Sequence, residues 1–383
     1  MNFQPLKDFL DFYLPMLGVP GSDTSIYKDH QEIFRYQSGY DSLKFRTPVR
    51  SNALYHMYSV SKVSTCVAAT QLIERGEILI SDPVYAYFPE FKDLTVKVRN
   101  NDGSFDVRPA TKTMTVKHLL TMTAGLNYNI NDRPALKQAR ASRGGRCPTL
   151  EIVRALAKDP LDFEPGENYQ YSLCLDVIGG LVELVSGMKF GDYLRENIFL
   201  PLGMNNTSFG MDEEKYAMLA TQYKYDAVNK CAIEIPKEEN NYNFGPEYES
   251  GGAGLISCVD DQILLADALT HLGKGKNGNR ILSEFGVELM RSNCLSTSQL
   301  DQFARLHHLG YGYGFGVRTN LKSSDGGNLA PVGEFGWDGA KLSYLSCDPS
   351  TKVAVFHAEH MGGLHSVIIP RLRNVIYACL EEK

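Results

Sequence analysis

Residues 59–76 read SVSKVSTCVAATQLIERG, and this stretch is typical of a helix. Its apolar side chains recur at helical spacing, and Gly76 is a suitable residue to end the helix. The stripe consists of Val60, Val63, Cys66, Val67, Thr70 and Ile73. Ser59 and Lys62 are three residues apart and so share one helix face. A serine hydroxyl is a poor nucleophile at neutral pH, and a lysine amine at this spacing is suited to accept or polarise its proton.

Strand signals lie near both ends of the chain. Residues 25–40 alternate in polarity around Asp29-His30-Gln31, which predicts a β-hairpin. Residues 341–347 and 352–357 flank the turn sequence Asp348-Pro349-Ser350-Thr351 and predict a second hairpin. Residues 3–16 and 366–382 carry apolar residues at helical spacing, so we expect a helix at each terminus.

Helical signals dominate the middle of the chain. Helices are predicted from Thr115 to Leu120, from Leu150 to Ala157 and from Leu173 to Val185, with Thr115 and Thr149 as candidate caps. We therefore expect a discontinuous sheet domain at 1–81 and 210–383, and a mainly helical inserted domain at 82–209. The fold class is α/β (α+β), with a mostly antiparallel sheet flanked by the terminal helices and a site in the cleft between the domains.

Composition is that of an ordinary globular protein. The 383 residues are 43% hydrophobic and 22% charged, and the net charge of −6 gives no reason to expect nucleic acid or an anionic membrane as partner. No run of eighteen apolar residues is present and the N-terminus does not read as a secretory signal, so a cytoplasmic location is expected. The oligomeric state is not indicated.

Cysteine and histidine patterns give no metal signature. The eight cysteines are scattered without a C-x-x-C pair, which predicts reduced and mostly buried thiols. His357, Glu359 and His360 lack the helical H-E-x-x-H spacing of a zinc site. His307-His308 is predicted to be loop surface.

Two further segments have the character of site loops. Residues 163–173, FEPGENYQYSL, lead from a Pro-Gly turn to Tyr171 at the start of a helix. A phenol there would act as a general base if its pKa were depressed; the alternative is that Tyr171 is a buried aromatic residue, and the Pro-Gly approach favours Tyr171 over Tyr169 as the site tyrosine. Residues 335–340, FGWDGA, enter a strand whose glycines permit close approach to a substrate and whose edge N–H is a suitable oxyanion donor.

Taken together, these segments resemble the serine β-lactamase and penicillin-binding-protein superfamily, in the branch of class C β-lactamases and family VIII carboxylesterases. The resemblance covers about residues 20–360. It is supported by RGEILISDPV at 75–84, TVKHLLTMTAGL at 115–126, PLGM at 201–204 and GGAGLIS at 251–257. It implies the β-lactamase/transpeptidase-like fold and an acyl-enzyme mechanism that requires no metal or organic cofactor.

The resemblance also implies roles for individual residues. Ser59 would be the acylated nucleophile, Lys62 its partner and Tyr171, the tyrosine of the Y-x-N motif, the base. Trp337-Asp338-Gly339 occupies the place of K-T-G. The oxyanion hole would be formed by the backbone N–H groups of Ser59 and Ala340, and the acyl group would leave to water or to another acceptor.

Two departures from the family pattern bear on the substrate. Leu173 stands in place of the asparagine of Y-x-N, and Trp337 followed by Asp338 in place of the lysine of K-T-G. Penicillins and D-Ala-D-Ala peptides carry a carboxylate that needs a nearby cation, so these residues favour neutral esters. Lys341 could still meet a carboxylate.

Alternatives remain open. Trp337, Asp338, Gly339 and Leu173 are expected to contact a small ester or amide substrate, although Trp337, the only tryptophan, could instead pack under the sheet edge. The leading activity is carboxylester hydrolysis or acyl transfer; a β-lactamase or D-aminoacyl peptidase, and a non-hydrolytic acyl-binding sensor, are the alternatives. The basic stretch Arg133, Lys137, Arg140, Arg143 and Arg146 is either a solvated surface or a rim that attracts anionic substrates.

Overall fold

A single large antiparallel sheet organises the molecule. The computed structural model describes residues 1–306 and 308–381. The sheet has eight strands in the order β10-β11-β12-β13-β14-β1-β2-β3. The strands are β1 (Gly21–Lys28), β2 (Gln31–Ser42), β3 (Thr47–Pro48), β10 (Tyr311–Tyr313), β11 (Arg318–Asn320), β12 (Phe335–Asp338), β13 (Ser343–Asp348) and β14 (Val353–Ala358).

The two ends of the chain meet in the middle of this sheet, as predicted. Strand β1 pairs with β14, with Ile26 opposite Val355. Both expected hairpins are present, as β1–β2 and β13–β14. All pairings within the sheet are antiparallel in the described residues, which confirms the predicted fold class.

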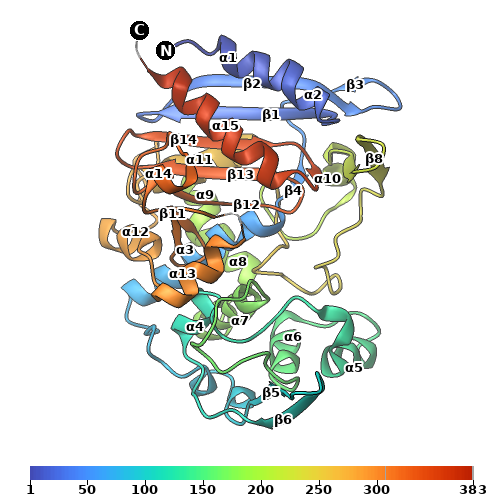
Figure 1. Cartoon of the computed structure of the whole chain (residues 1–383), viewed down its shortest axis with the longest axis vertical. Coiled ribbons are helices and arrows are strands. Elements are labelled where there is room, and N and C mark those ends of the chain that lie inside the picture. Colours follow the sequence, from blue (N-terminus) through green and yellow to red (C-terminus); the bar gives the residue numbers. More distant parts are fainter. Residues whose placement is uncertain (307, 382–383) are drawn as a thin grey trace.

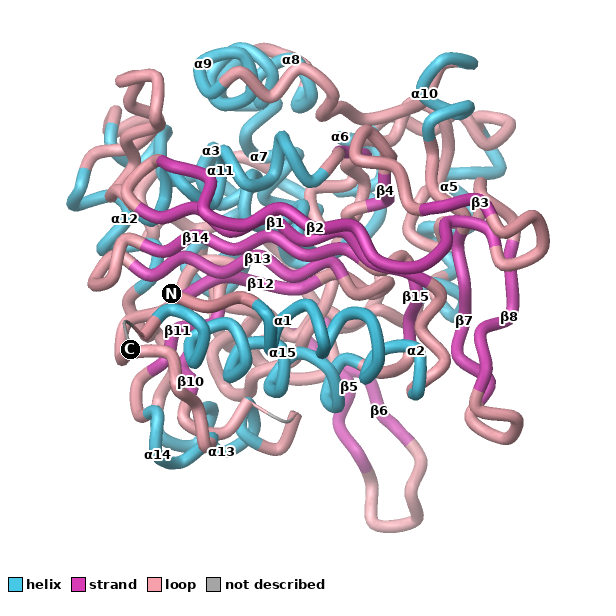
Figure 2. The backbone as a smooth tube through the Cα atoms, turned by 90° about the horizontal axis from the view of Figure 1, so that it is seen from above, coloured by secondary structure: helices cyan, strands magenta, loops and turns pink. Residues whose placement is uncertain are grey.

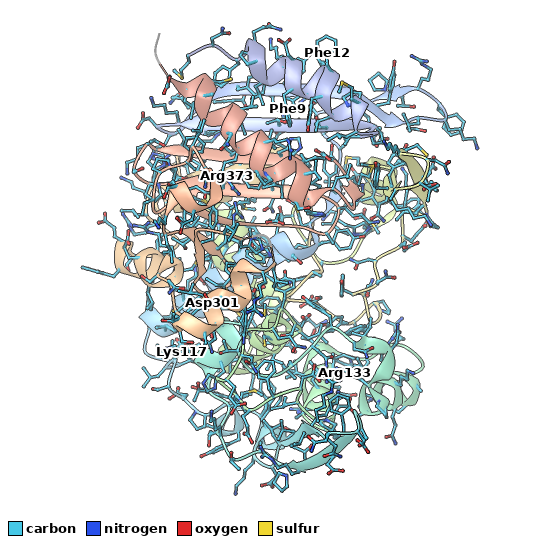
Figure 3. The ribbon with its side chains drawn as sticks, in the orientation of Figure 1. Phe9, Phe12, Lys117, Arg133, Asp301 and Arg373 are labelled. Atoms are coloured by element: carbon cyan, nitrogen blue, oxygen red, sulfur yellow. The ribbon has the colours of Figure 1, made fainter. Side chains whose placement is uncertain are left out.

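The terminal helices cover one face of the sheet, and α11 (Val259–Thr270) covers the other (Figures 1 and 2). The N-terminal helical segment comprises α1 (Gln4–Asp8), a π-helical turn (Phe9–Tyr13) and α2 (Leu14–Met16), and α15 (His365–Leu380) closes the chain. The N-terminal segment is amphipathic, since Phe9 is buried whereas Phe12 is exposed (Figure 3). Asn2 N–H donates to the Cys379 carbonyl, so the two ends lie together.

The helix predicted around Ser59 forms as a 3₁₀ turn (Tyr58–Val60) that continues into α3 (Ser61–Glu74). It packs against α7 (Cys174–Ser186). The predicted apolar stripe is too narrow, because Ser61, Ser64 and Thr65 are buried as well. Ser61 Oγ accepts from the Leu255 N–H (3.1 Å) and Thr65 Oγ1 donates to the Gly251 carbonyl (2.7 Å), whereas Ser64 Oγ has no hydrogen-bond partner among the described residues.

The middle of the chain is mainly helical, with one exception. A hairpin of β5 (Thr95–Arg99) and β6 (Phe105–Pro109) lies in the stretch that was expected to lack strands (Figure 1). The cap predicted at Thr149 is wrong, because α6 already begins at Thr149, and its Oγ1 instead accepts the Glu249 N–H. The helices of this region are α4 (Val116–Leu120), α5 (Pro134–Ser142), α6 (Thr149–Leu156), α7, α8 (Phe190–Leu194) and α9 (Leu200–Leu202), with a π-helical turn at Arg195–Phe199.

The remaining elements join these two parts. Further strands are β4 (Tyr55–His56), β7 (Gln222–Asp226), β8 (Cys231–Ile235), β9 (Ile256–Ser257) and β15 (Met361–Gly362). Further helices are α10 (Glu213–Met218), α12 (Glu284–Arg291), α13 (Thr297–Ala304) and α14 (Ser323–Gly326). The domain limits at residues 81 and 210 stay a prediction.

Candidate active site

The backbone before Ser59 is held in an unusual conformation. Tyr58 has a φ of +46°, in the left-handed region that few residues other than glycine adopt. Its buried phenol donates to Gln222 Oε1 (2.7 Å) and to the Glu239 carbonyl (3.0 Å), which fixes the turn. Local strain of this kind is found at functional sites, and here it positions the serine at the start of α3.

Lys62 lies directly behind Ser59. Its Nζ is 3.2 Å from Ser59 Oγ and donates to the Tyr128 hydroxyl (2.8 Å) and the Gly252 carbonyl (2.6 Å). Burial of the whole side chain lowers the pKa of Lys62 to about 7, although the Asp176 carboxylate opposes this shift. A neutral amine has two N–H donors and one lone pair. With both donors engaged by Tyr128 and Gly252, the lone pair is left for the Ser59 proton.

Tyr171 contacts the same hydroxyl from the other side. Its phenol oxygen accepts a hydrogen bond from Trp337 Nε1 (2.9 Å), and the phenol also interacts with the Ser59 side chain. Burial raises the pKa of Tyr171, and the bonds from Ser59 and Trp337 offset only part of that rise. The expected depression of its pKa is therefore wrong: the phenol stays protonated in the free protein, and Lys62 is the group able to take up a proton near neutral pH.

An aromatic cavity of about 340 Å³ opens above Ser59. Its wall includes five aromatic side chains, namely Tyr128, Tyr169, Tyr171, Tyr242 and Trp337. Trp337 therefore lines the cavity as well as packing against Tyr171, with ring centroids 5.5 Å apart. A mostly apolar wall with a few convergent polar groups is typical of a small-molecule site.

The end of β12 forms the opposite rim. Asp338, Gly339 and Ala340 line the same cavity as Ser59. Gly339 N–H donates to the Ser343 carbonyl (2.7 Å), and Ser343 Oγ donates to the Met57 carbonyl (3.1 Å), which ties this rim to the segment before the nucleophile. The oxyanion hole formed by the N–H groups of Ser59 and Ala340 stays a prediction, and this placement is compatible with it.

Leu173, which was expected at the substrate, and Lys341, which was left open as a contact for a carboxylate, both lie outside the cavity wall. Leu173 precedes α7 and is buried in the core, and it is not part of the cavity wall that the described residues form. Lys341 is also outside that wall, because its Nζ donates to the Tyr223 carbonyl (3.3 Å). Partial burial lowers the pKa of Lys341.

Several cavity residues were missed or misplaced from the sequence. Tyr128, Tyr242 and His365 line the cavity but carry no periodic signal. The prediction that His308 is loop surface is confirmed only in part: it lies in a loop, but it is half-buried, its ring stacks on Phe303 with centroids 4.6 Å apart, and it lines the cavity. His307 lies outside the described residues. Tyr128 follows the family-like segment 115–126 by only two residues, and that proximity is the one signal that could have indicated it.

The four arginines of the basic stretch at 133–146 bond to other parts of the protein, whereas Lys137 is exposed. Arg133 is buried and donates to Asn127 Oδ1 (3.1 Å), Arg140 donates to the Phe244 carbonyl (3.2 Å), and Arg146 pairs with Glu247 (3.0 Å). Arg143 pairs with Glu151. Within the described residues no member of the stretch lines the Ser59 cavity, so the structure does not place it at the rim.

The histidine and acidic residues considered as a metal site from the sequence, and the three-residue group found in the structure, lie outside the cavity wall. Both ring nitrogens of His357 are engaged, by Thr24 Oγ1 (2.7 Å) and Glu359 Oε1 (3.0 Å). In the described part of the chain, one group of three possible ligands was found. It consists of His30, Asp267 and His271, at the β1–β2 turn and the end of α11, with ligand atoms within 4.8 Å of one another. None of these three residues contributes to the Ser59 cavity.

This fold and this serine–lysine–tyrosine arrangement define a protein of the serine β-lactamase and penicillin-binding-protein superfamily. The family profile described as Beta-lactamase matches residues 7–358, and the chain belongs to that family. Its relatives include Esterase EstB from Burkholderia gladioli, 31% identical over 265 residues, which are 64% of each chain. Acyltransferase calJ from Penicillium decumbens is 30% identical over 62% of this chain and 58% of its own.

Solved structures show the same fold. EstCE1, described as a hydrolase with promiscuous acyltransferase activity, matches with a TM-score of 0.78 and 24% identity over 98% of both chains. Unliganded simvastatin synthase (LovD) from Aspergillus terreus matches with a TM-score of 0.80 and 20% identity, over 99% of this chain and 100% of that one. No helix in the described residues is long and apolar enough to cross a membrane.

Proposed function

We propose that this protein is a serine hydrolase or acyltransferase that forms an acyl-enzyme on Ser59 and acts on small carboxylic esters. The observation that carries the proposal is the placement of Ser59 Oγ between Lys62 Nζ and the Tyr171 phenol at the base of an aromatic cavity. Relatives that are an esterase and an acyltransferase support the same class of reaction.

The proposed reaction begins with transfer of the Ser59 proton to neutral Lys62. Ser59 Oγ attacks the ester carbonyl, and the backbone N–H groups of Ser59 and Ala340 would hold the resulting oxyanion. Tyr171, protonated and hydrogen-bonded to Ser59, is placed to pass a proton to the leaving alcohol and to recover it from Lys62. Water or a second alcohol then attacks the acyl-enzyme by the reverse sequence and releases Ser59.

The aromatic wall favours an ester over a β-lactam or a D-aminoacyl peptide. The K-T-G position is filled by Trp337, whose indole N–H is used by Tyr171, and Lys341 is held by the Tyr223 carbonyl. Neither residue provides the cation that a penicillin carboxylate would meet at this position.

The test is turnover of p-nitrophenyl butyrate by the wild type and by Ser59→Ala, with intact mass recorded in parallel after exposure to benzylpenicillin. We expect many turnovers of the ester by the wild type, none by the variant, and no lasting penicillin adduct. A penicillin adduct without ester turnover would instead indicate a penicillin-recognising protein. An ester adduct that forms but never clears would indicate the acyl-binding sensor.

A further inference from the structure

A second cavity adjoins the Ser59 cavity. It has a volume of about 320 Å³ and lies between α15, β11 and the end of β12. Leu306, His308, Asp338 and His365 line both cavities, so the two lie side by side. A substrate bound at Ser59 could therefore extend a substituent into the second cavity.

Arg373 of α15, labelled in Figure 3, is one of the residues that line this second cavity. Its side chain is only 6% exposed, and its Nε donates to the Tyr344 hydroxyl (3.0 Å). The guanidinium lies 5.1 Å from the Tyr311 ring centroid and 5.5 Å from that of Tyr344. In the described residues no carboxylate lies within ion-pair distance of Arg373. A nearly buried guanidinium without an anionic partner is costly, and it is the group that proteins use to bind a carboxylate through two parallel hydrogen bonds.

Arg318 adds a second guanidinium to the same wall. It is 1% exposed, and its Nη2 is 3.3 Å from Glu334 Oε1. Its Nε and Nη1 make no hydrogen bond in the described structure, and Nη1 has only a 3.5 Å ion-pair contact with Asp338 Oδ1. The first turn of α15 also faces the cavity through His365 and Ser366, which adds the positive end of a sixteen-residue helix.

The charged side chains around this cavity determine whether it favours an anion with one negative charge or with two. Glu334 is fully buried against Arg318, Ser346 Oγ (2.5 Å) and the Tyr311 hydroxyl (3.1 Å), and Asp338 stands at the boundary between the two cavities. These two carboxylates offset the formal charge of the two guanidiniums. A dianion such as a phosphate monoester would therefore be opposed, whereas a single planar carboxylate matches the free donors of Arg373.

We propose that the second cavity binds a carboxylate carried by the substrate, so that the preferred ester of this protein is anionic at the end remote from the scissile bond. This inference rests on the proposed function for the position of the scissile bond. The expectation of a neutral ester rested on the absence of a cation at the Trp337 position. This inference replaces that expectation, because Arg373 of α15 and Arg318 of β11 supply positive charge in the adjoining cavity.

Three esters of one acyl length test the inference. Phenyl hexanoate is neutral, monophenyl adipate places a carboxylate on the acyl side, and 3-carboxyphenyl hexanoate places it on the leaving group. We expect the wild type to prefer one of the anionic esters by kcat/KM. Arg373→Gln should lower that preference, measured as a ratio to phenyl hexanoate, by about tenfold or more, the size of a lost charge-assisted hydrogen bond.

The matched control is Arg371→Gln, two residues away on α15, which removes the same charge from an exposed side chain whose Nη1 bonds the Val367 carbonyl. It should leave the ratio unchanged, and Arg373→Lys should restore part of it. A wild type without preference, or equal losses on all three esters in Arg373→Gln, would overturn the inference.

Calorimetry separates this inference from the proposed function. If the wild type turns over none of the esters, the proposed function fails, yet titration with hexanoate, which carries a single carboxylate, still decides whether the cavity binds a carboxylate. Binding to the wild type and to Arg371→Gln that is lost in Arg373→Gln supports the inference, and absence of binding to the wild type refutes it.

Discussion

The pH dependence of ester turnover tests the assigned proton acceptor. With a pKa of about 7, about half of the Lys62 side chains are neutral at pH 7, whereas an amine with the ordinary pKa of 10.5 would be neutral in about one molecule in 3,000. The base acts in its neutral form, so kcat/KM should rise with pH and level off above the pKa of Lys62. Between about pH 8 and about pH 6 the neutral fraction falls about tenfold, and kcat/KM should fall with it.

The assay is the initial rate of p-nitrophenyl butyrate hydrolysis at subsaturating substrate, followed at a wavelength where p-nitrophenol and its anion absorb equally. Lys62→Arg is the control, because a guanidinium does not release its proton in this range and activity should be lost at every pH. A profile that is flat from about pH 6 to about pH 8, or that rises only near pH 10, would refute the assignment of Lys62 as the base.

A variant of Asp176 tests whether the charge of this residue affects the pKa of Lys62. Asp176 is buried beside Gly252, where its Oδ1 accepts from Ser250 Oγ (2.5 Å), and its charge raises the pKa of Lys62. Asp176→Asn keeps an accepting oxygen but removes the charge. The rising limb of the pH profile should therefore move to lower pH, and a limb that stays in place or moves to higher pH would contradict the electrostatic account.

Three further substitutions have defined outcomes. Tyr171→Phe should lower kcat/KM by about a hundredfold or more while the rising limb near pH 7 remains, because Lys62 is intact; a near-full rate would remove Tyr171 from the proton path. Trp337→Phe keeps an aromatic ring in the cavity wall, although a smaller one, and removes the N–H bond to Tyr171; loss of that bond should cost about 2- to 13-fold in kcat/KM, whereas a loss beyond a hundredfold would show a larger role for the indole. Gly339→Ala would place a Cβ against the Met57 carbonyl oxygen and Ser343 Oγ, so both activity and the denaturant midpoint should fall; an unchanged midpoint would contradict the tight packing of this rim.

The fold was largely predictable because its main elements carry local signals. The hairpins β1–β2 and β13–β14 have turn residues between alternating strands, and both formed as predicted. The hairpin β5–β6 was missed although Asn101-Asp102-Gly103 lies between the alternating segments 95–99 and 105–109. This turn signal is local and sufficient to predict a hairpin. It was overlooked because the segments around it are predicted to be helical.

The burial of α3 on all sides could not be predicted from local sequence signals. An amphipathic pattern indicates one buried face, but Ser61, Ser64 and Thr65 are buried because α7 and the loop at 250–255 cover what would otherwise be the polar side. Whether a serine or threonine is exposed depends on partners far away in sequence, which periodicity does not report.

The motif residues of the candidate site were predicted, whereas other residues of the cavity wall were missed. Ser59, Tyr171, Trp337, Asp338, Gly339 and Ala340 were all expected, and all line one cavity. The predicted lowering of the Tyr171 pKa was wrong, because burial of the phenol raises its pKa and the depth of burial is not visible in the sequence. Tyr128, which accepts a hydrogen bond from Lys62, lies outside the predicted elements. Arg373 lies in the predicted C-terminal helix, but helical spacing does not show that its side chain lines a cavity.

The measurement that tests the central claim most directly is the site of acylation. The protein is mixed with p-nitrophenyl butyrate, quenched in acid within the first turnovers, and analysed by intact mass and by peptide mapping, with Ser59→Ala treated in parallel. We predict a butyryl group on the peptide that contains Ser59, absent from the variant and lost from the wild type when the substrate is exhausted. Turnover by the wild type with no acylated Ser59 at any time, or undiminished turnover by Ser59→Ala, would contradict the acyl-enzyme mechanism.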